Sequence, residues 1–262
     1  MKIIASYNLK GGVGKTTTAG NLAYLSAAEG RRTLLWDLDP QGAATYLLRI
    51  APHVKGGSTR LVERRKPIHT ALKGSDYPGL DLLPADFTYR NMDVDLAHAQ
   101  PARRRAARTL ARVLAQLADE YDVVFLDTPP SMSLVSENVL HAADVVVVPL
   151  IPTVLAIRTF DQLQAFLATA NGHRPRLHAF FSMTDRRKAL HRQIMAELPR
   201  ECDDISPTTI PALALIEQMT VRQAALPDFA PRSAATRAYR NLWHEIAQLA
   251  DLDHLPEPVH QR

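Results

Sequence analysis

Residues 8–17 read NLKGGVGKTT and lie between the apolar run KIIASY, residues 2–7, and the helix-like run AGNLAYLSAAEG, residues 19–30. A glycine-rich turn that leads from a strand into a helix exposes backbone N–H groups and the positive end of the helix dipole, and both attract phosphate. Three glycines allow the backbone to approach such a ligand closely: Gly11, Gly12 and Gly14. The stretch therefore predicts a phosphate-binding loop.

The end of this loop, Gly14-Lys15-Thr16, has the order of a nucleotide-binding P-loop, in which the lysine reaches the β- and γ-phosphates and the hydroxyl binds Mg²⁺. Its beginning does not follow that pattern. The first glycine of G-x-x-x-x-G-K-[ST] falls on Leu9, and the next residue, Lys10, is a lysine that the ordinary motif does not require. The motif therefore predicts nucleotide binding, but it does not explain the role of Lys10.

Composition indicates a globular chain. Of 262 residues, 46% are apolar and 22% charged, and no shift in composition divides the chain, so we expect a single domain over residues 1–262. The single cysteine, Cys202, excludes a disulfide framework and a cysteine-built metal site within one chain. Met1 leads directly into a strand-like run, and the longest apolar stretch, residues 145–157, is too short to span a bilayer. We expect a soluble, cytoplasmic protein.

Short β-branched runs alternate with longer helical patterns along the chain, which predicts an α/β fold: a mostly parallel, twisted sheet with helices on both faces. The expected strands cover residues 2–7, 33–37, 80–83, 123–127, 145–149 and 177–182. The expected helices cover residues 16–29, 103–120, 133–141, 153–171, 187–198 and 234–250. Residues 50–78 read as surface loops with a short helix, and Trp36, Trp243 and Met183 as core residues.

Acidic residues follow two of the expected strands. Asp37 and Asp39 belong to DLDPQG, residues 37–42, and Asp127 ends the apolar run VVFL. Ligands of open parallel sheets bind beyond the carboxyl ends of the strands, where these residues and the glycine-rich loop would meet. Asp127 has the usual position of the carboxylate that holds Mg²⁺ in P-loop nucleotidases, and a second carboxylate near the γ-phosphate can orient or deprotonate water. The sequence does not divide this last role between Asp37 and Asp39.

These residues resemble a known family. Residues 10–17, KGGVGKTT, are similar to the deviant Walker A motif of the ParA/MinD ATPases within the SIMIBI class, DLDPQG to their switch I, and FLDTPPS to their Walker B and switch II. Ser182 to Leu198, Ile210-Pro211 and Pro231 to Tyr239 resemble later ParA segments, so the likeness extends almost over the whole chain. Leu9 and Ala212 depart from it, standing where relatives often carry glutamine and arginine.

The resemblance implies a weak, partner-stimulated, Mg²⁺-dependent ATP hydrolase with ATP and Mg²⁺ as cofactors. Lys10 would be the signature lysine that reaches across an ATP-bound sandwich dimer to the other subunit's phosphates, and Lys15 and Asp39 would share the catalytic role. Nucleotide binding would involve Lys10, Gly11, Gly12, Val13, Gly14, Lys15, Thr16, Thr17 and, beside the adenine, Pro211. The metal would be held by Thr16, Asp39 and Asp127.

Within that family, several branches fit poorly. Nitrogenase-type iron proteins need two cluster cysteines, and MinD-like proteins end in a basic amphipathic membrane helix, whereas this chain ends DLDHLPEPVHQR. No tyrosine-rich tail of the related kinases is present, and Lys10 lies too close to Met1 for the helix-turn-helix domain of larger plasmid ParA proteins. A small ParA-like ATPase remains, with no membrane contact expected.

Such a protein would bind DNA non-specifically as an ATP-dependent homodimer, associate with the nucleoid, and position a plasmid, a chromosome or a protein body such as a carboxysome. A ParB-like or adaptor protein on the cargo would stimulate hydrolysis. The net charge of +4 does not by itself argue for DNA binding, so the local clustering of basic residues is the better guide. The residues selected for contact with DNA phosphates are Arg187, Arg222, Arg232 and Arg237. A second basic cluster, residues 103–112, reads as a solvated helix face.

Three alternatives share the fold. One is a metabolic P-loop enzyme similar to dethiobiotin synthetase, although no polar small-substrate constellation is evident in the sequence. The second is a MinD-like positioning ATPase. The third is a nucleotide-gated binding module with negligible turnover. Phosphate release measured with and without DNA would separate the first and third from a ParA-like ATPase.

Overall fold

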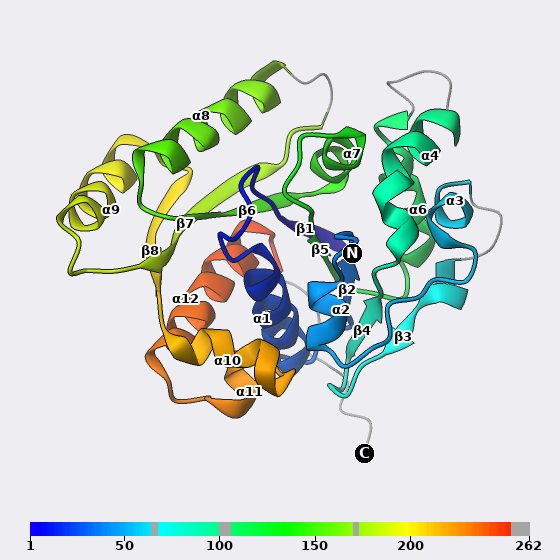
Figure 1. Ribbon diagram of the computed structural model, residues 1–262, viewed down its shortest axis with the longest axis horizontal. Helices are drawn as coiled ribbons and strands as arrows, with labels where there is room; N and C mark the ends of the chain where they lie inside the picture. Colours follow the sequence, from blue (N-terminus) through cyan, green and yellow to red (C-terminus); the bar gives the residue numbers. More distant parts are fainter. Residues whose placement is uncertain (64–67, 100–105, 170–172, 253–262) are drawn as a thin grey trace.

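The computed structural model describes residues 1–63, 68–99, 106–169 and 173–252. Its centre is an eight-stranded sheet with the order β3-β4-β2-β5-β1-β6-β7-β8 (Figure 1). Every neighbouring pair is parallel except β3 with β4, which is antiparallel. The strands are β1 Lys2–Ser6, β2 Thr33–Asp37, β3 Lys73–Gly74, β4 Leu80–Leu83, β5 Val123–Asp127, β6 Val145–Leu150, β7 Arg176–Thr184 and β8 Ile205–Pro211.

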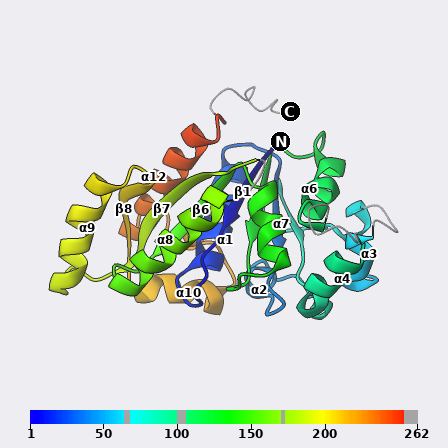
Figure 2. The same cartoon turned by 90° about the horizontal axis from the view of Figure 1, so that it is seen from above.

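Helices cover both faces of this sheet (Figure 2). One face carries α3 Gly57–Val62, α4 Met92–Ala99, α6 Thr109–Leu114, α7 Leu134–Ala142, α8 Val154–Thr169 and α9 Ala189–Glu201. The other carries α1 Lys15–Ala28, α2 Ala43–Leu47, α10 Ala214–Arg222, α11 Leu226–Phe229 and α12 Ala234–Leu249. Short 3₁₀ turns lie at Ile68–Ala71, Phe87–Asn91 and Ala115–Leu117. The predicted α/β class, with a mostly parallel sheet covered on both faces, is confirmed.

Two hydrophobic cores form because successive side chains of a strand point to opposite faces. In β5, Val124 and Leu126 pack into the core under α6 and α7, while Val123 and Phe125 pack into the core under α1 and α12. Strands buried on both sides read as continuous apolar runs, which is why β5 could be recognised in the sequence. Trp243 of α12 closes the second core, with its ring centroid 5.8 Å from that of Phe125.

The sequence prediction missed one long strand. Strand β8, ISPTTIP, contains two prolines and three hydroxyl residues, so it lacks the apolar run that identified the others. It lies at the edge of the sheet, where proline is tolerated because one side of the strand needs no ladder hydrogen bonds. Its pairing with β7 contains two register shifts, which fits this irregular sequence.

Other expectations need correction. The helix expected over residues 103–120 is interrupted by a turn at Ala107 and Arg108, and α6 begins at Thr109. Arg103, Arg104 and Arg105 of the expected basic face lie outside the described residues. Helices α4 and α10 were not anticipated, and the region expected to hold a short helix contains α3. Met183 is 44% exposed with a φ of 52°, not in the core, whereas Trp36 and Trp243 are buried.

The strand ends that matter most are in register. Ser6 of β1 pairs with Asp127 of β5, and Asp127 pairs with Asp37 of β2, so these three residues end neighbouring strands at one level of the sheet. The loops that follow them therefore start side by side. Among the helices described, none is long and apolar enough to cross a membrane. The expectation that the C-terminal sequence forms no membrane helix falls largely on residues 253–262, which lie outside the described part of the chain.

Candidate nucleotide site

The glycine-rich loop leaves β1 and enters α1 at Lys15 (Figure 1). Gly12 and Gly14 have φ values of 70° and 95°, in the left-handed region that side chains disfavour. At Gly14 a Cβ atom would also come within 3.0 Å of the Ser182 Oγ. Two hydroxyl groups fix the turn: Ser6 Oγ donates to the Lys15 carbonyl at 2.9 Å, and Thr18 Oγ1 donates to the Gly14 carbonyl at 2.8 Å. These contacts and the left-handed glycines fix the shape of the turn between β1 and α1.

The start of the loop is held by Asn8, a residue that sequence reasoning did not select. Its side chain is 3% exposed; its Nδ2 donates to the Pro149 carbonyl at 2.8 Å, and its Oδ1 accepts the Lys10 amide at 2.9 Å. Asn8 therefore joins the end of β6 to the backbone of Lys10. The only sequence signal was a polar residue placed directly after an apolar strand, and that is too common to be diagnostic.

The two lysines of the loop have different environments. Lys15 is 7% exposed, and its Nζ donates to the Lys10 carbonyl at 3.1 Å, so its ammonium group lies inside the curve of the loop. Burial lowers the pKa of Lys15, while the carboxylates of Asp127 and Asp39 oppose that shift. The Lys10 side chain is exposed to solvent. One lysine of the loop is therefore buried inside its curve, and the other is exposed.

Asp127 is the most unusual group of the site. It is fully buried, and among the described residues neither of its carboxylate oxygens has a hydrogen-bond partner within normal distance. Burial raises the pKa of Asp127 well above its ordinary value, and the charge of Asp37 adds to this, while the nearby Thr16 hydroxyl and Lys15 oppose it. A buried carboxylate without partners is costly unless a cation or donor joins it. Asp127 and the Thr16 hydroxyl are hard oxygen ligands that fit Mg²⁺.

Within the described residues, no cluster of three or more His, Cys, Asp or Glu side chains is placed to hold a metal ion. This agrees with the way proteins bind Mg²⁺, which keeps several waters and takes one or two carboxylates together with substrate phosphates. The donor set around Asp127 therefore fits a magnesium–nucleotide complex better than a metal held by protein alone.

Asp37 and Asp39, whose roles the sequence did not distinguish, have different environments in the structure. Asp37 is fully buried and its oxygens are occupied: Oδ2 accepts the Thr45 amide at 2.7 Å and the Thr45 hydroxyl at 2.8 Å, and Oδ1 accepts the Asp39 amide at 3.2 Å. Burial raises the pKa of Asp37 to about 6 against these hydrogen bonds. Asp39 is half-buried, and its Oδ1 accepts the Gln41 amide at 2.9 Å. Asp37 anchors the loop, and Asp39 keeps the more accessible carboxylate.

Loops from neighbouring strands enclose the glycine-rich turn. A Cβ atom at Gly11 would meet the Pro130 ring at 3.8 Å, so the segment after β5 packs against the turn. The Tyr7 hydroxyl donates to the Ser131 carbonyl at 2.9 Å, which the Ser136 hydroxyl also contacts, at 2.6 Å. These bonds tie the loop after Asp127 to the end of β1.

Pro211 lies at the end of β8, beside a groove of about 600 Å³. The groove is lined by Thr184, Asp185, Arg186, Arg187, Thr209, Pro211, Ala212, Leu213, Ala234 and Ala238. Its position at the carboxyl ends of β7 and β8, with a proline ring and small apolar side chains, suits a flat, apolar-faced ligand group.

The four arginines selected for DNA contact are all exposed, but their surroundings differ. Arg187 forms a bidentate ion pair with Asp185, whose pKa it holds down to about 2. Arg222 stacks its guanidinium 5.0 Å from the Phe229 ring centroid. Arg237 donates to the carbonyl of Arg232 at 2.7 Å, so these two lie together where α12 begins. The structure brings Arg232 and Arg237 together and pairs Arg187 with Asp185.

Comparison with known proteins matches this architecture. The AAA domain family matches residues 1–179. The chain is 36% identical to the chromosome-partitioning ATPase Soj of Thermus thermophilus, over 93% of this chain and 94% of that protein. It is 32% identical to the chromosome partitioning protein ParA of Caulobacter vibrioides, over 94% of each chain.

Solved structures agree with the fold. A single-residue variant of Cyanothece McdA in complex with ATP superposes with a TM-score of 0.79 at 20% identity, covering 94% of this chain and 96% of that one. Cobyrinic acid a,c-diamide synthase from Mycobacterium smegmatis, solved with an ATP analogue and magnesium, has a TM-score of 0.79 at 27% identity over 100% of both chains. With the glycine-rich loop, the strand-end aspartates and relatives at this identity over nearly the whole chain, the protein belongs to the ParA/MinD family of P-loop ATPases.

Proposed function

We propose that the chain binds and hydrolyses ATP with Mg²⁺ at the loop between β1 and α1. The observation that carries this is Asp127, a fully buried carboxylate without a hydrogen-bond partner among the described residues, in register with Ser6 beneath the loop. Asp127 and the Thr16 hydroxyl would hold Mg²⁺, and the loop amides and Lys15 would bind the phosphates. The adenine would lie beside Pro211. When bound, Mg²⁺ supplies Lewis-acid stabilisation of charge on the phosphates.

The catalytic part of the proposal assigns Asp39 to the attacking water and Lys10 to the partner's phosphates. Asp39 is the accessible carboxylate, since Asp37 already accepts hydrogen bonds from Thr45. Lys10 is exposed at the turn, so it can deliver its cation to a second subunit as an arginine finger does. Hydrolysis would then depend on an ATP-bound homodimer.

Exposed apolar side chains at the same edge of the sheet support such a dimer. Met132 follows β5 and is 51% exposed, and Val154 and Leu155 follow β6 and are 66% and 65% exposed. They stand after the carboxyl ends of strands that flank β1, the strand that carries the loop. A second copy placed over the nucleotides would cover these residues and bring each Lys10 toward the opposite site.

The dimer would bind DNA non-specifically through phosphate contacts. Arg232 and Arg237 form the strongest candidate pair because they lie together and are exposed, with Arg222 as a third contact. Arg187 is the weakest of the four, since Asp185 already neutralises it. The DNA-bound dimer would distribute a cargo over the nucleoid, and a ParB-like or adaptor protein on the cargo would stimulate hydrolysis and release it. The partition proteins named above supply this biological setting, with plasmid, chromosome or protein-body cargo all compatible.

A metabolic enzyme is the second candidate because the likeness to cobyrinic acid a,c-diamide synthase covers the whole chain. The two functions make opposite predictions for DNA. For the positioning ATPase, DNA affinity is high with ATP, low with ADP, and falls steeply with salt because each phosphate contact releases counterions. Binding of fluorescent duplex DNA should therefore be titrated with ATP, ADP and no nucleotide, for the wild type and Arg232→Ala. DNA binding that ignores the nucleotide, or none at low salt, would overturn the proposed function.

A further inference from the structure

Two helices on the nucleotide face end in the same unusual way. Arg49, after α2, and Gln223, after α10, adopt φ values of 58° and 49°. Each closes a helix with a six-residue turn: the Ile50 amide donates to the Thr45 carbonyl at 3.1 Å, and the Ala224 amide to the Met219 carbonyl at 3.2 Å. Glycine is the usual residue at such positions, and a side chain there costs about 1 kcal/mol. Asp251, after α12, has the same conformation at φ 53°, so what distinguishes Arg49 and Gln223 is the set of contacts that their side chains make with each other's helix.

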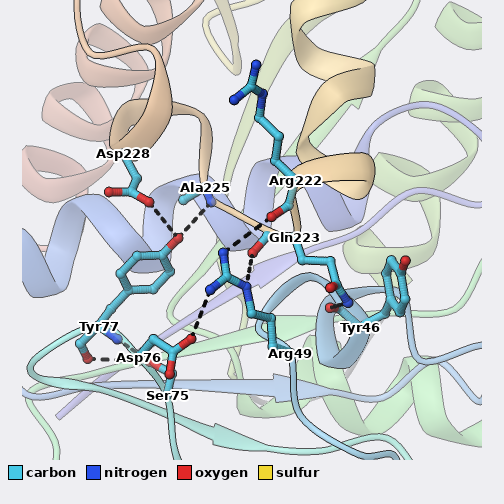
Figure 3. A network of polar contacts seen from close by, with 9 residues as sticks. All are labelled: Tyr46, Arg49, Ser75, Asp76, Tyr77, Arg222, Gln223, Ala225 and Asp228. Atoms are coloured by element: carbon cyan, nitrogen blue, oxygen red, sulfur yellow. Dashed lines mark hydrogen bonds and ion pairs between the residues drawn. The ribbon is translucent and has the colours of Figure 1, made fainter.

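The two side chains cap each other's helix. Arg49 Nε donates to the Gln223 carbonyl at 3.1 Å and its Nη2 to the Arg222 carbonyl at 3.3 Å, while Gln223 Nε2 donates to the Tyr46 carbonyl at 3.1 Å (Figure 3). We call this set of three bonds the cross-cap. The Arg49 cation also lies at the carboxyl end of α10, where a helix dipole favours positive charge. An ion pair of 3.4 Å with Asp76 holds the guanidinium in place.

One end of the cross-cap leads directly to the nucleotide loops. Helix α2 starts just after Gly42, at the end of the segment that holds Asp37 and Asp39. Thr45, in the middle of α2, donates both its amide and its hydroxyl to the Asp37 carboxylate, and its hydroxyl accepts the Ala85 amide at 2.8 Å. Asp37 also accepts the Asp39 amide at 3.2 Å, so it joins α2 to the segment that carries Asp39.

The other end leads to the proposed DNA surface. Helix α10 ends at Arg222, and the chain continues into α11, whose Leu226 amide donates to the Asn21 Oδ1 of α1 at 2.8 Å. The same Asn21 donates to the Met219 sulfur at 3.3 Å. A cavity of about 600 Å³, lined in part by Arg49, Gln223 and Tyr24, lies against the joint, so the cross-cap is not locked by dense packing on that side.

We propose that the cross-cap carries the nucleotide state from α2 to α10, and that Arg49 and Gln223 are positioning residues for the DNA-contacting surface. This rests on the proposed function, since it assumes that nucleotide gates DNA binding. Because each side chain donates to the last carbonyls of the other residue's helix, moving α2 away from α10 would break all three bonds of the cross-cap. α10 and its Arg222 should then follow α2 when ATP binds.

Glycine substitutions give a sharp test because glycine keeps the left-handed backbone and deletes only the side chain. The variants are Arg49→Gly and Gln223→Gly. A matched control is Asp251→Gly, which makes the same backbone change at φ 53° after α12, where the side chain pairs with Lys2 and Arg176. Each variant is measured for ATP affinity, for thermal unfolding, and for the ratio of DNA affinity with ATP to that with ADP.

We expect ATP affinity and the melting temperature to stay near wild type in both cross-cap variants, while the ATP/ADP ratio of DNA affinity falls by about fivefold or more, the size of a typical allosteric coupling. The double variant should lose no more than either single one, and Asp251→Gly should keep the wild-type ratio. A cross-cap variant with wild-type gating overturns the inference. A wild type without gating overturns the proposed function instead.

A second readout does not depend on DNA. Hydrogen exchange of α10 amides is followed with and without a non-hydrolysable ATP analogue, in the wild type and Arg49→Gly. The inference expects the analogue to change exchange in both α2 and α10 of the wild type, and in α2 alone of the variant. An equal α10 response in the variant, or no α10 response in the wild type, contradicts it.

Discussion

Asp37 and Asp127 end adjacent parallel strands in register, yet only Asp37 has its carboxylate filled by hydrogen bonds from the protein. Thr45 and the Asp39 amide satisfy Asp37, whereas both oxygens of Asp127 lack a partner within the described residues. At the same level of two neighbouring strands, the Asp37 carboxylate therefore has a structural role, while the Asp127 carboxylate remains available to a ligand.

This division predicts opposite effects on the stability of the nucleotide-free protein. Asp37→Ala leaves two buried Thr45 donors unpaired and should lower the free energy of unfolding by about 1–3 kcal/mol. Asp127→Asn removes a buried carboxylate that has no partner and should leave that free energy unchanged or raise it. Urea unfolding without nucleotide or Mg²⁺ measures both. Equal losses in the two variants would show that Asp127 is as well satisfied as Asp37.

Lys15→Ala should abolish ATP binding. The Lys15 ammonium lies inside the loop, 3.1 Å from the Lys10 carbonyl, where we propose that the phosphates bind. We expect the ATP dissociation constant, measured by calorimetry with Mg²⁺, to rise by about 100-fold, a loss near 2.7 kcal/mol. Lys73→Ala, at an exposed lysine of the edge strand β3, is the control and should bind ATP as the wild type does. An unchanged affinity in Lys15→Ala would refute the nucleotide site.

The lowered pKa of Glu245 predicts that the folded protein loses stability in acid. Burial raises the pKa of this carboxylate, but hydrogen bonds from His178 at 2.9 Å, Thr208 and Ser206 outweigh burial and lower it from the ordinary 4.5. A pKa lowered on folding stabilises the protein above the unfolded-state value, and this stabilisation is lost as pH falls through the folded-state value. Urea midpoints of the wild type should therefore fall more below pH 4.5 than those of Glu245→Gln. Parallel pH profiles would contradict this.

The nucleotide loop could be predicted from sequence because its chemistry is local. Glycines, lysines and the hydroxyl stand within one short stretch, and Asp127 ends a strand that is apolar throughout. Asn8 and Thr45 could not be selected, since their roles depend on partners far away in the chain: the Pro149 carbonyl for Asn8 and the Ala85 amide for Thr45. Composition could not indicate that a buried asparagine would find such partners.

The fold, like the site, was predictable only where the sequence signal is local. Strands buried on both faces were predicted closely, while β8 was missed because an edge strand needs no continuous apolar run. The left-handed conformations of Arg49 and Gln223 had no sequence signal either, since glycine is the residue expected at such turns. The sequence selected Arg187 for DNA contact, but its ion pair with Asp185 could not be read from the sequence.

Asp39→Ala should bind ATP and lose turnover. Its carboxylate is half-buried and remains accessible, while Asp37 holds the loop in place, so removing Asp39 should leave the nucleotide cradle intact. Steady-state phosphate release should fall to background, with ATP affinity within about twofold of the wild type, because a group that acts on the water contributes mainly in the transition state. A variant that still hydrolyses ATP would transfer this role to another residue.

Mixing two inactive variants tests whether Lys10 acts across the dimer. Lys10→Ala and Asp39→Ala each bind ATP but should be inactive alone. In a mixed dimer, one site combines the intact Asp39 of the first variant with the intact Lys10 of the second. If Lys10 acts in trans, an equal mixture should recover about a quarter of the wild-type rate of phosphate release, since half of the dimers are mixed and each has one complete site. Phosphate release no greater than the sum of the two variants measured separately would show that Lys10 does not act on the partner's site.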